Sequence, residues 1–147
     1  MKRILIPVDG SAKSLEAVSA CVREGPAAIA RIDLLNVQPL LNSHIARWLT
    51  RAQRDSWRAQ RSQLALARAK GKVEMAGIPC HTHSATGPIA GVIAATAQRL
   101  RCHEIVIGAS RRGPLARFLA NSISTQLLEA SCLAVRVIPA EDPVRGR

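Results

Sequence analysis

Two short runs of this sequence are apolar at every position: residues 4–8 (ILIPV) and residues 105–107 (IVI). A strand with one buried face alternates apolar and polar residues, so an uninterrupted apolar run is typical of a strand covered on both faces. Strands of this kind occur mostly in parallel sheets whose crossover helices cover the two faces. We therefore expect the two runs to form the centre of a parallel sheet.

Further strands and helices alternate along the chain. Apolar patterning predicts three more strands at residues 31–37, 78–85 and 134–138, the last of which ends at Pro139. Helices are predicted at residues 11–24, 45–75, 88–100 and 122–130, with Ser11 as an N-cap, Pro88 in a first turn and a loop over residues 38–44. This order predicts an α/β fold, an open parallel five-stranded sheet with helices on both faces. We expect one domain over residues 1–140 and a short C-terminal tail over residues 141–147.

The composition is that of an ordinary globular domain. A chain of 147 residues, 48% of them hydrophobic, can form a core without disulfides or a structural metal. The apolar stretch near the start is too short for a signal peptide or a membrane span, so we expect a cytoplasmic protein with no transmembrane segment. Scattered cysteines without a CxxC pair predict reduced, buried thiols at Cys21, Cys80, Cys102 and Cys132.

Positive charge is concentrated in one segment. The formal net charge is +11, and most of the excess falls in residues 47–72. Spacings of four and three residues place five arginines on one helix face: Arg47, Arg51, Arg54, Arg58 and Arg61. The simplest interpretation is a solvated face, and the alternative is contact with an acidic protein or another anionic partner.

The few aromatic residues bear on what this basic face could bind. Trp48, Trp57 and Phe118 are the only aromatic residues, so no extensive platform for stacking bases is available and nucleic acid is not an expected partner. We expect the two tryptophans to cover the core or a dimer seam.

Two histidines in a predicted strand are a second polar feature. His81 and His83 share one face of the strand, and Cys80 points to the other face. A zinc site needs further ligands at suitable spacing, and the nearby sequence offers none, so no metal is predicted. A surface or interface role is the favoured interpretation.

In open parallel sheets, ligands bind outside the carboxyl ends of the strands, where the strand order reverses. The segments to search therefore follow Val8, Val37 and Ile107. Asp9 stands where the first strand opens into a helix, after Pro7 and Val8. Its carboxylate can accept from a ligand hydroxyl or amine, or it can satisfy backbone donors of its own turn.

The segment after the fourth strand has the features of a phosphate site. Gly108 follows the buried strand directly, Arg111 and Arg112 supply positive charge, and Asn121 with Ser122 opens the next helix. Exposed backbone donors, cations and a helix N-terminus together suit phosphate groups. The same features are also found in ordinary loops and caps.

Several segments of the sequence together resemble a known family. The segments ILIPVDGSAKS, LLNV, TGPIAGVIAATAQRLRCHEIVIGAS, NSIS and CLAVRVIP together are similar to the universal stress protein (UspA-like) family over nearly the whole chain. The resemblance implies a Rossmann-like fold with strand order 3-2-1-4-5. It also implies a homodimer through the last strand, here residues Ala134 to Ile138.

The ATP-binding branch of this family has the pattern G-x2-G-x9-G-[ST]. Gly108 and Ser122 match its first and last positions, but Arg111 and Asn121 stand where two glycines are expected. Asp9 matches the family's acidic residue near adenosine, and Val37 a position whose backbone meets adenine. The resemblance thus implies ATP or another adenine nucleotide bound by Pro7, Val8, Asp9, Val37, Gly108, Arg111, Arg112, Asn121, Ser122 and Ile123.

The sequence therefore predicts a stress-response and regulatory domain that acts by binding. The alternative is a protein-interaction module that binds no nucleotide and uses the arginine-rich helix face. An enzyme is the least favoured class, with weak ATP hydrolysis as its upper limit. The sequence lacks the HxGH-like signature of nucleotidyl transferases of similar fold, and it has no base placed to activate water for hydrolysis.

Overall fold

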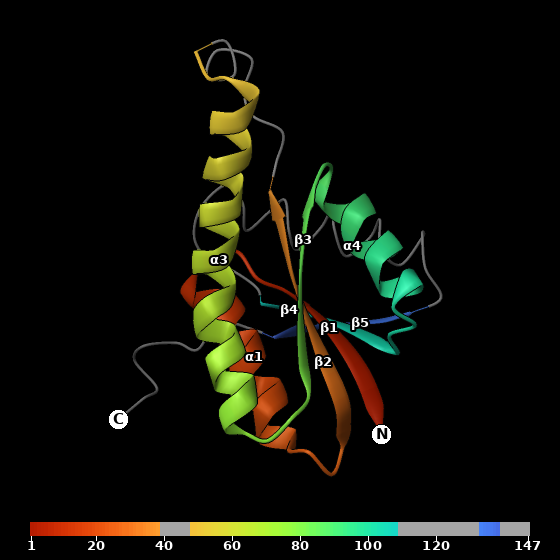
Figure 1. Ribbon diagram of the computed structural model, residues 1–147. Coiled ribbons are helices and arrows are strands. Elements are labelled where there is room, and N and C mark those ends of the chain that lie inside the picture. The colour runs from red at the N-terminus through yellow and green to blue at the C-terminus, as the bar shows by residue number, and fades with distance from the viewer. Residues whose placement is uncertain (39–47, 109–132, 139–147) are drawn as a thin grey trace, which may run out of the picture.

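The computed structural model describes residues 1–38, 48–108 and 133–138. In chain order its elements are β1 (Lys2–Pro7), α1 (Ala12–Glu24), β2 (Ile29–Gln38), α3 (Arg51–Met75), β3 (Cys80–Thr86), α4 (Ile89–Arg99), β4 (Glu104–Gly108) and β5 (Ala134–Ile138). All strand pairs are parallel, and the sheet has the order β3-β2-β1-β4-β5 (Figure 1). The predicted α/β class and the strand order 3-2-1-4-5 are confirmed.

The central strands β1 and β4 are the two runs that are apolar at every position. Helices cover both faces of the sheet, with α1 and α3 on one side and α4 on the other (Figure 1). Because neighbouring residues of a strand point to opposite faces, Ile4 and Ile6 join one core while Leu5 joins the other. The unbroken apolar runs are therefore explained by burial on both faces.

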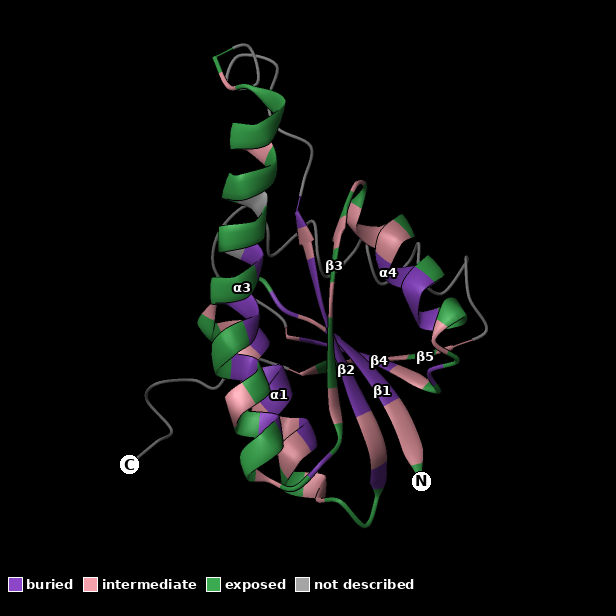
Figure 2. Ribbon diagram, viewed as in Figure 1, coloured by how far each residue is buried: buried purple, intermediate pink, exposed green. Residues whose placement is uncertain are grey.

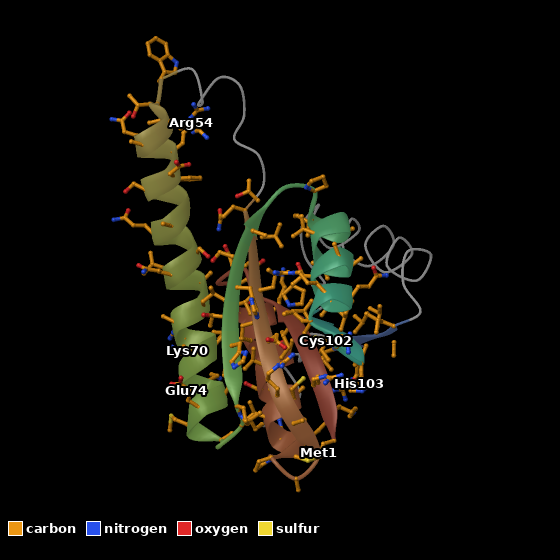
Figure 3. The ribbon with its side chains drawn as sticks, turned by 45° about the vertical axis from the view of Figure 1, so that its right-hand side comes forward. Met1, Arg54, Lys70, Glu74, Cys102 and His103 are labelled. Atoms are coloured by element: carbon orange, nitrogen blue, oxygen red, sulfur yellow. The ribbon has the colours of Figure 1, made fainter. Side chains whose placement is uncertain are left out.

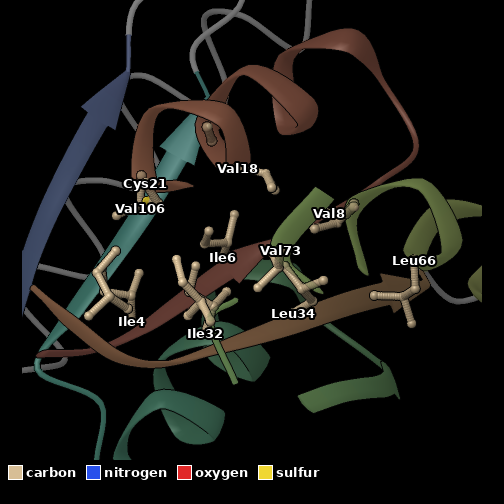
Figure 4. Close-up of a cluster of buried hydrophobic side chains, with 14 residues drawn as sticks. Ile4, Ile6, Val8, Val18, Cys21, Ile32, Leu34, Leu66, Val73 and Val106 are labelled. Atoms are coloured by element: carbon tan, nitrogen blue, oxygen red, sulfur yellow. The ribbon is translucent and has the colours of Figure 1, made fainter. Parts of the chain in front are cut away.

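The larger core lies between the sheet and helices α1 and α3 (Figure 4). Val18 and Cys21 of α1 and Val73 of α3 pack there against the strands. The second core lies under α4, where Ile93 and Ala97 pack against the opposite face of the sheet.

The helix ends follow the local sequence. The Ser11 side chain accepts a hydrogen bond from the backbone N–H of Ser14 at the start of α1. Gly25 ends that helix with φ +81°, a left-handed conformation that glycine adopts without strain. Pro88 lies at the N-cap of α4, one position earlier than the predicted first turn.

Helix α3 begins later than predicted and extends past the end of the sheet. Its first buried side chain, among those described, is Ser62, and the upper turns in Figure 2 are mainly exposed. Trp48 is 82% exposed and Trp57 is 38% exposed. The expectation that these tryptophans cover the core is therefore wrong, because they lie at and beyond the end of the packed region.

Other predictions meet the structure only in part. Gln38, expected to begin a loop, is the last residue of β2. The remainder of that loop, the helix at residues 122–130 and the tail at residues 141–147 lie outside the described residues. None of the helices in the described ranges is both long enough and apolar enough to cross a membrane.

Candidate functional site

The candidate site lies at the carboxyl ends of β1 and β4, where the strand order reverses. Strand β1 pairs with β2 on one side and with β4 on the other, and the chain after β1 enters α1. The register pairs Ile4 with Glu104 and Leu5 with Ile105, so Val8 and Gly108 lie at the same end of the two strands. The fold thus brings together predicted site residues from three strands: Pro7, Val8, Asp9, Val37 and Gly108.

A tight turn joins β1 to α1 and holds Asp9 at this edge. Gly10 has φ +86°, a left-handed backbone conformation that residues with a Cβ atom rarely adopt. Asp9 Oδ1 accepts hydrogen bonds from the backbone N–H of Ser11 at 2.8 Å and from the Ser14 hydroxyl at 3.1 Å. The turn interpretation of Asp9 is therefore confirmed, and it orients the carboxylate at the open edge of the sheet.

The environment of Asp9 keeps its carboxylate charged. Burial alone would raise its pKa, but hydrogen bonds from Ser11, Ser14 and its own backbone outweigh burial and lower the pKa below the ordinary value. An ionised carboxylate has about four acceptor positions, so it can accept from a ligand in addition to the bonds within the turn. Asp9 is thus suited to bind the hydroxyl groups of a sugar.

Asn36, a buried side chain missed in the sequence, separates β1 from β2 at this edge. The ladder between the two strands ends with Val8 N–H donating to Leu35 C=O at 2.7 Å. In a regular ladder the Val8 carbonyl would next accept Val37 N–H, but it accepts Asn36 Nδ2 at 2.7 Å. Among the described residues, no backbone bond joins Val37 to Val8. The backbone N–H of Val37 is therefore not used in the ladder with β1 and lies at the open end of that ladder.

A short polar chain holds Asn36 in place. Gln38 Nε2 donates to Asn36 Oδ1 at 2.6 Å, and the Gln38 carbonyl accepts Gly87 N–H at 3.2 Å. Asn36 is 2% exposed, so these bonds satisfy an amide that is costly to bury alone. The signal in the sequence was a polar residue among the apolar residues 34–37 of the strand.

Gly108 has a packing role in this site. A Cβ atom built there would lie 2.2 Å from the Lys13 carbonyl oxygen and 2.7 Å from its carbon. Only a residue without a side chain lets the end of β4 approach the first turn of α1 this closely. The other predicted site residues, Arg111, Arg112, Asn121, Ser122 and Ile123, lie outside the described residues.

The two histidines of β3 belong to a separate polar cluster under α4. Asp33, with 0% exposure, accepts from Arg31 Nε at 2.8 Å and is bonded to His83 Nε2 at 2.9 Å. His81 is more distant, with Nδ1 3.9 Å from the same carboxylate. The shared face is confirmed, but the surface interpretation is wrong for His83, which partners a buried acid. Within the described ranges, no group of three or more residues could hold a metal ion.

The prediction of buried thiols is confirmed for Cys21 and Cys102 but not for Cys80, which is only partly buried. Burial raises the pKa of Cys21 and of Cys102 to about 11. Both are free, as is the half-buried Cys80, while Cys132 lies outside the described residues.

Comparison with known proteins agrees with this architecture. The chain is similar to the universal stress protein MJ0531 of Methanocaldococcus jannaschii, with 27% identity over 146 residues, covering 93% of this chain and 81% of that protein. Its fold is similar to that of hypothetical protein MJ0577, with TM-score 0.79 and 17% identity over 96% of this chain and 97% of the other. An Arabidopsis thaliana universal stress family protein, solved with AMP bound, has TM-score 0.69 and 18% identity, over 96% of this chain and 93% of its own.

The family assignment rests on sequence over nearly the full chain. The model of the universal stress protein family matches residues 1–139, which include every strand of the sheet. The chain therefore belongs to the universal stress protein family.

Proposed function

We propose that this universal stress protein domain binds an adenine nucleotide at the carboxyl edge of β1 and β4 and acts by binding rather than by turnover. The observation that carries the proposal is the separation of β1 from β2 at Asn36. It leaves the backbone N–H of Val37 outside the ladder with β1, at the same edge that holds the charged Asp9.

The two groups suit different parts of a nucleoside. A backbone N–H and C=O can recognise the edge of adenine, which carries both a donor and an acceptor. The Asp9 carboxylate would accept hydrogen bonds from the hydroxyl groups of the ribose. AMP bound to the Arabidopsis thaliana relative supports this class of ligand.

The phosphates are proposed to lie toward Gly108 and the segment that follows it. Arg111 and Arg112 would supply charge there, and Asn121, Ser122 and Ile123 the backbone and hydroxyl donors of a helix start. The net charge of +11 favours anions in general. ATP is the larger candidate and AMP the smaller.

Isothermal titration with AMP and ATP tests the proposal, with GMP as the control for base recognition. Asp9→Asn keeps the acceptor for Ser11 and Ser14 but removes the charge, so we expect AMP affinity to fall about tenfold, or about 1.4 kcal/mol. Asp55→Asn, which removes an exposed carboxylate of α3, is the matched control. The proposal fails if neither adenine nucleotide binds, or if GMP binds as tightly as AMP.

The edge strand supports a second part of the proposal, a homodimer formed through β5. In the described part of the chain, β5 pairs only with β4, and Val137 is 41% exposed. An open strand edge is a template for pairing with a second copy. Light scattering should give a dimer mass for the natural chain and a monomer mass for Val137→Lys. A monomeric natural chain would contradict this part.

A further inference from the structure

The first three turns of α3 form an arm whose described side chains are mainly exposed. The arm comprises residues 51–61, about 16 Å of helix, and its described side chains include none that is buried. In Figure 1 the yellow start of α3 extends past the arrowhead of β2. An isolated helix of this length is marginal in water, so the arm depends on the packed part of α3 and on the capping box between Thr50 and Gln53.

Three large apolar side chains lie on one side of α3. Residues seven or eleven apart lie nearly in line on an α-helix, so Trp57, Leu64 and Met75 share one stripe. Gly71 lies on the same stripe, and a Cβ built there would meet nothing within 4 Å. Leu64 is 76% exposed and Met75 is 92% exposed. We call these four residues the outer seam.

The outer seam leads into a hollow between two helices. An open cavity of about 360 Å³ lies between α1 and α3, lined by Ser19, Val22, Lys72, Met75 and Ala76. Lys72 Nζ donates to Ser19 Oγ at 3.1 Å across it. Met75 belongs both to the seam and to the lining of the hollow, so the two meet near the end of α3.

Positive charge follows one edge of this surface. Arg54, Arg68 and Lys72 lie along the flank of the seam, spaced by fourteen and four residues. Helix α3 as a whole has seven basic and two acidic residues. Glu74 lies on the opposite flank, where its carboxylate is 3.8 Å from Lys70 Nζ (both labelled in Figure 3). The seam is thus an apolar stripe with a basic edge.

We propose that the outer seam binds an acidic amphipathic helix of a partner protein. The apolar face of that helix would cover Leu64 and Met75, and its carboxylates would pair with Arg54 and Arg68. Trp, Met and Arg are enriched at the centres of protein interfaces, which matches the composition of the seam.

Two other occupants fit less well. A second copy of this chain would bring basic residues against basic residues, because the chain has 21 Lys and Arg against 10 Asp and Glu and none of the described helices is acidic. A nucleic acid would pair with the arginines but would leave Leu64 and Met75 in water.

A designed peptide of about 20 residues is the probe, with leucines at heptad a and d positions and mainly glutamate elsewhere. Fluorescence anisotropy with the full chain compares it with a scrambled peptide of equal composition, a DNA duplex and anionic lipid vesicles. We expect the patterned peptide to bind at least about tenfold more tightly than the scrambled one. Equal binding of the two peptides, or binding of the duplex or the vesicles alone, overturns the proposal.

Single substitutions then locate the binding surface. Leu64→Gln and Arg68→Gln should each weaken binding of the patterned peptide about tenfold, and Lys70→Gln on the opposite flank is the matched control. All three positions are exposed, so circular dichroism should show an unchanged fold. An effect of Lys70→Gln equal to that of Leu64→Gln contradicts the proposal. AMP titration of Leu64→Gln should match the natural chain, which separates this surface from the nucleotide site.

Discussion

Replacing Gly108 by alanine should destabilise the domain through a single steric contact. The added Cβ would be 2.2 Å from the Lys13 carbonyl oxygen, so the two groups must separate by about 1 Å to reach ordinary van der Waals contact. That oxygen is part of the first turn of α1, where it accepts the amide of the buried Ala17, and it cannot rotate away as a flexible side chain would. Overpacking of this kind costs about 1–3 kcal/mol.

Thermal unfolding measures this cost. For a domain of this size, we expect the melting temperature of Gly108→Ala to fall by about 3–10 °C. Gly71→Ala is the matched control, because its Cβ meets nothing within 4 Å and alanine favours the helix by about 0.5–1 kcal/mol. The two variants should therefore shift the melting temperature in opposite directions. If Gly108→Ala melts at or above the temperature of the natural chain, the close contact between β4 and α1 does not require glycine and the reasoning is wrong.

Three further predictions concern ionisable groups. Asp33→Asn removes the charge of a fully buried carboxylate that is ion-paired with Arg31. Urea unfolding should therefore show a loss of about 3 kcal/mol in unfolding free energy, and an unchanged midpoint would contradict a stabilising ion pair. Hydrogen bonding to Arg136 lowers the pKa of Glu24 in the folded protein. The ionised Glu24 therefore stabilises the fold above its unfolded pKa, and this stabilisation is lost as the pH falls through its folded pKa. The difference in unfolding free energy between the natural chain and Glu24→Gln should thus shrink below about pH 4. Burial raises the pKa of Cys21 and of Cys102 to about 11, so both thiols should react slowly with a disulfide reagent at neutral pH in the folded protein and rapidly in denaturant. Fast labelling of these two thiols before unfolding would count against their burial.

The sheet could be predicted from the sequence because its signals are local. Residues 4–8 and 105–107 are apolar at every position, and burial on both faces is the direct cause of that pattern. Ser11 and Gly25 likewise mark the two ends of α1 by their own backbone preferences. The other three strands were predicted from their own apolar patterning, whereas the strand order 3-2-1-4-5 came from the family resemblance.

The details of the site depend on contacts between distant residues. Asn36 and Val8 are 28 positions apart, and nothing in either segment indicates that an amide side chain replaces a rung of the ladder. The exposure of Trp48 also has a tertiary cause, because α3 is longer than the sheet that it covers. Composition predicts a buried tryptophan in such a case, but only the packing decides its burial.

Departures from local rules gather at the carboxyl edge of β1 and β4. Asn36 is a polar side chain inside a buried strand, Gly10 has a left-handed backbone, and Gly108 has no side chain at a position where two elements meet. Left-handed backbone also occurs at Gly25, Gly77 and Arg101, so the polar Asn36 and the close approach at Gly108 are what distinguish the edge that holds Asp9. Such departures are expected where function rather than stability has set the sequence. The cluster around Asp33 differs: its buried carboxylate is ion-paired with Arg31 and hydrogen-bonded to His83, and the strand register there is regular, so we interpret it as a structural feature of the core.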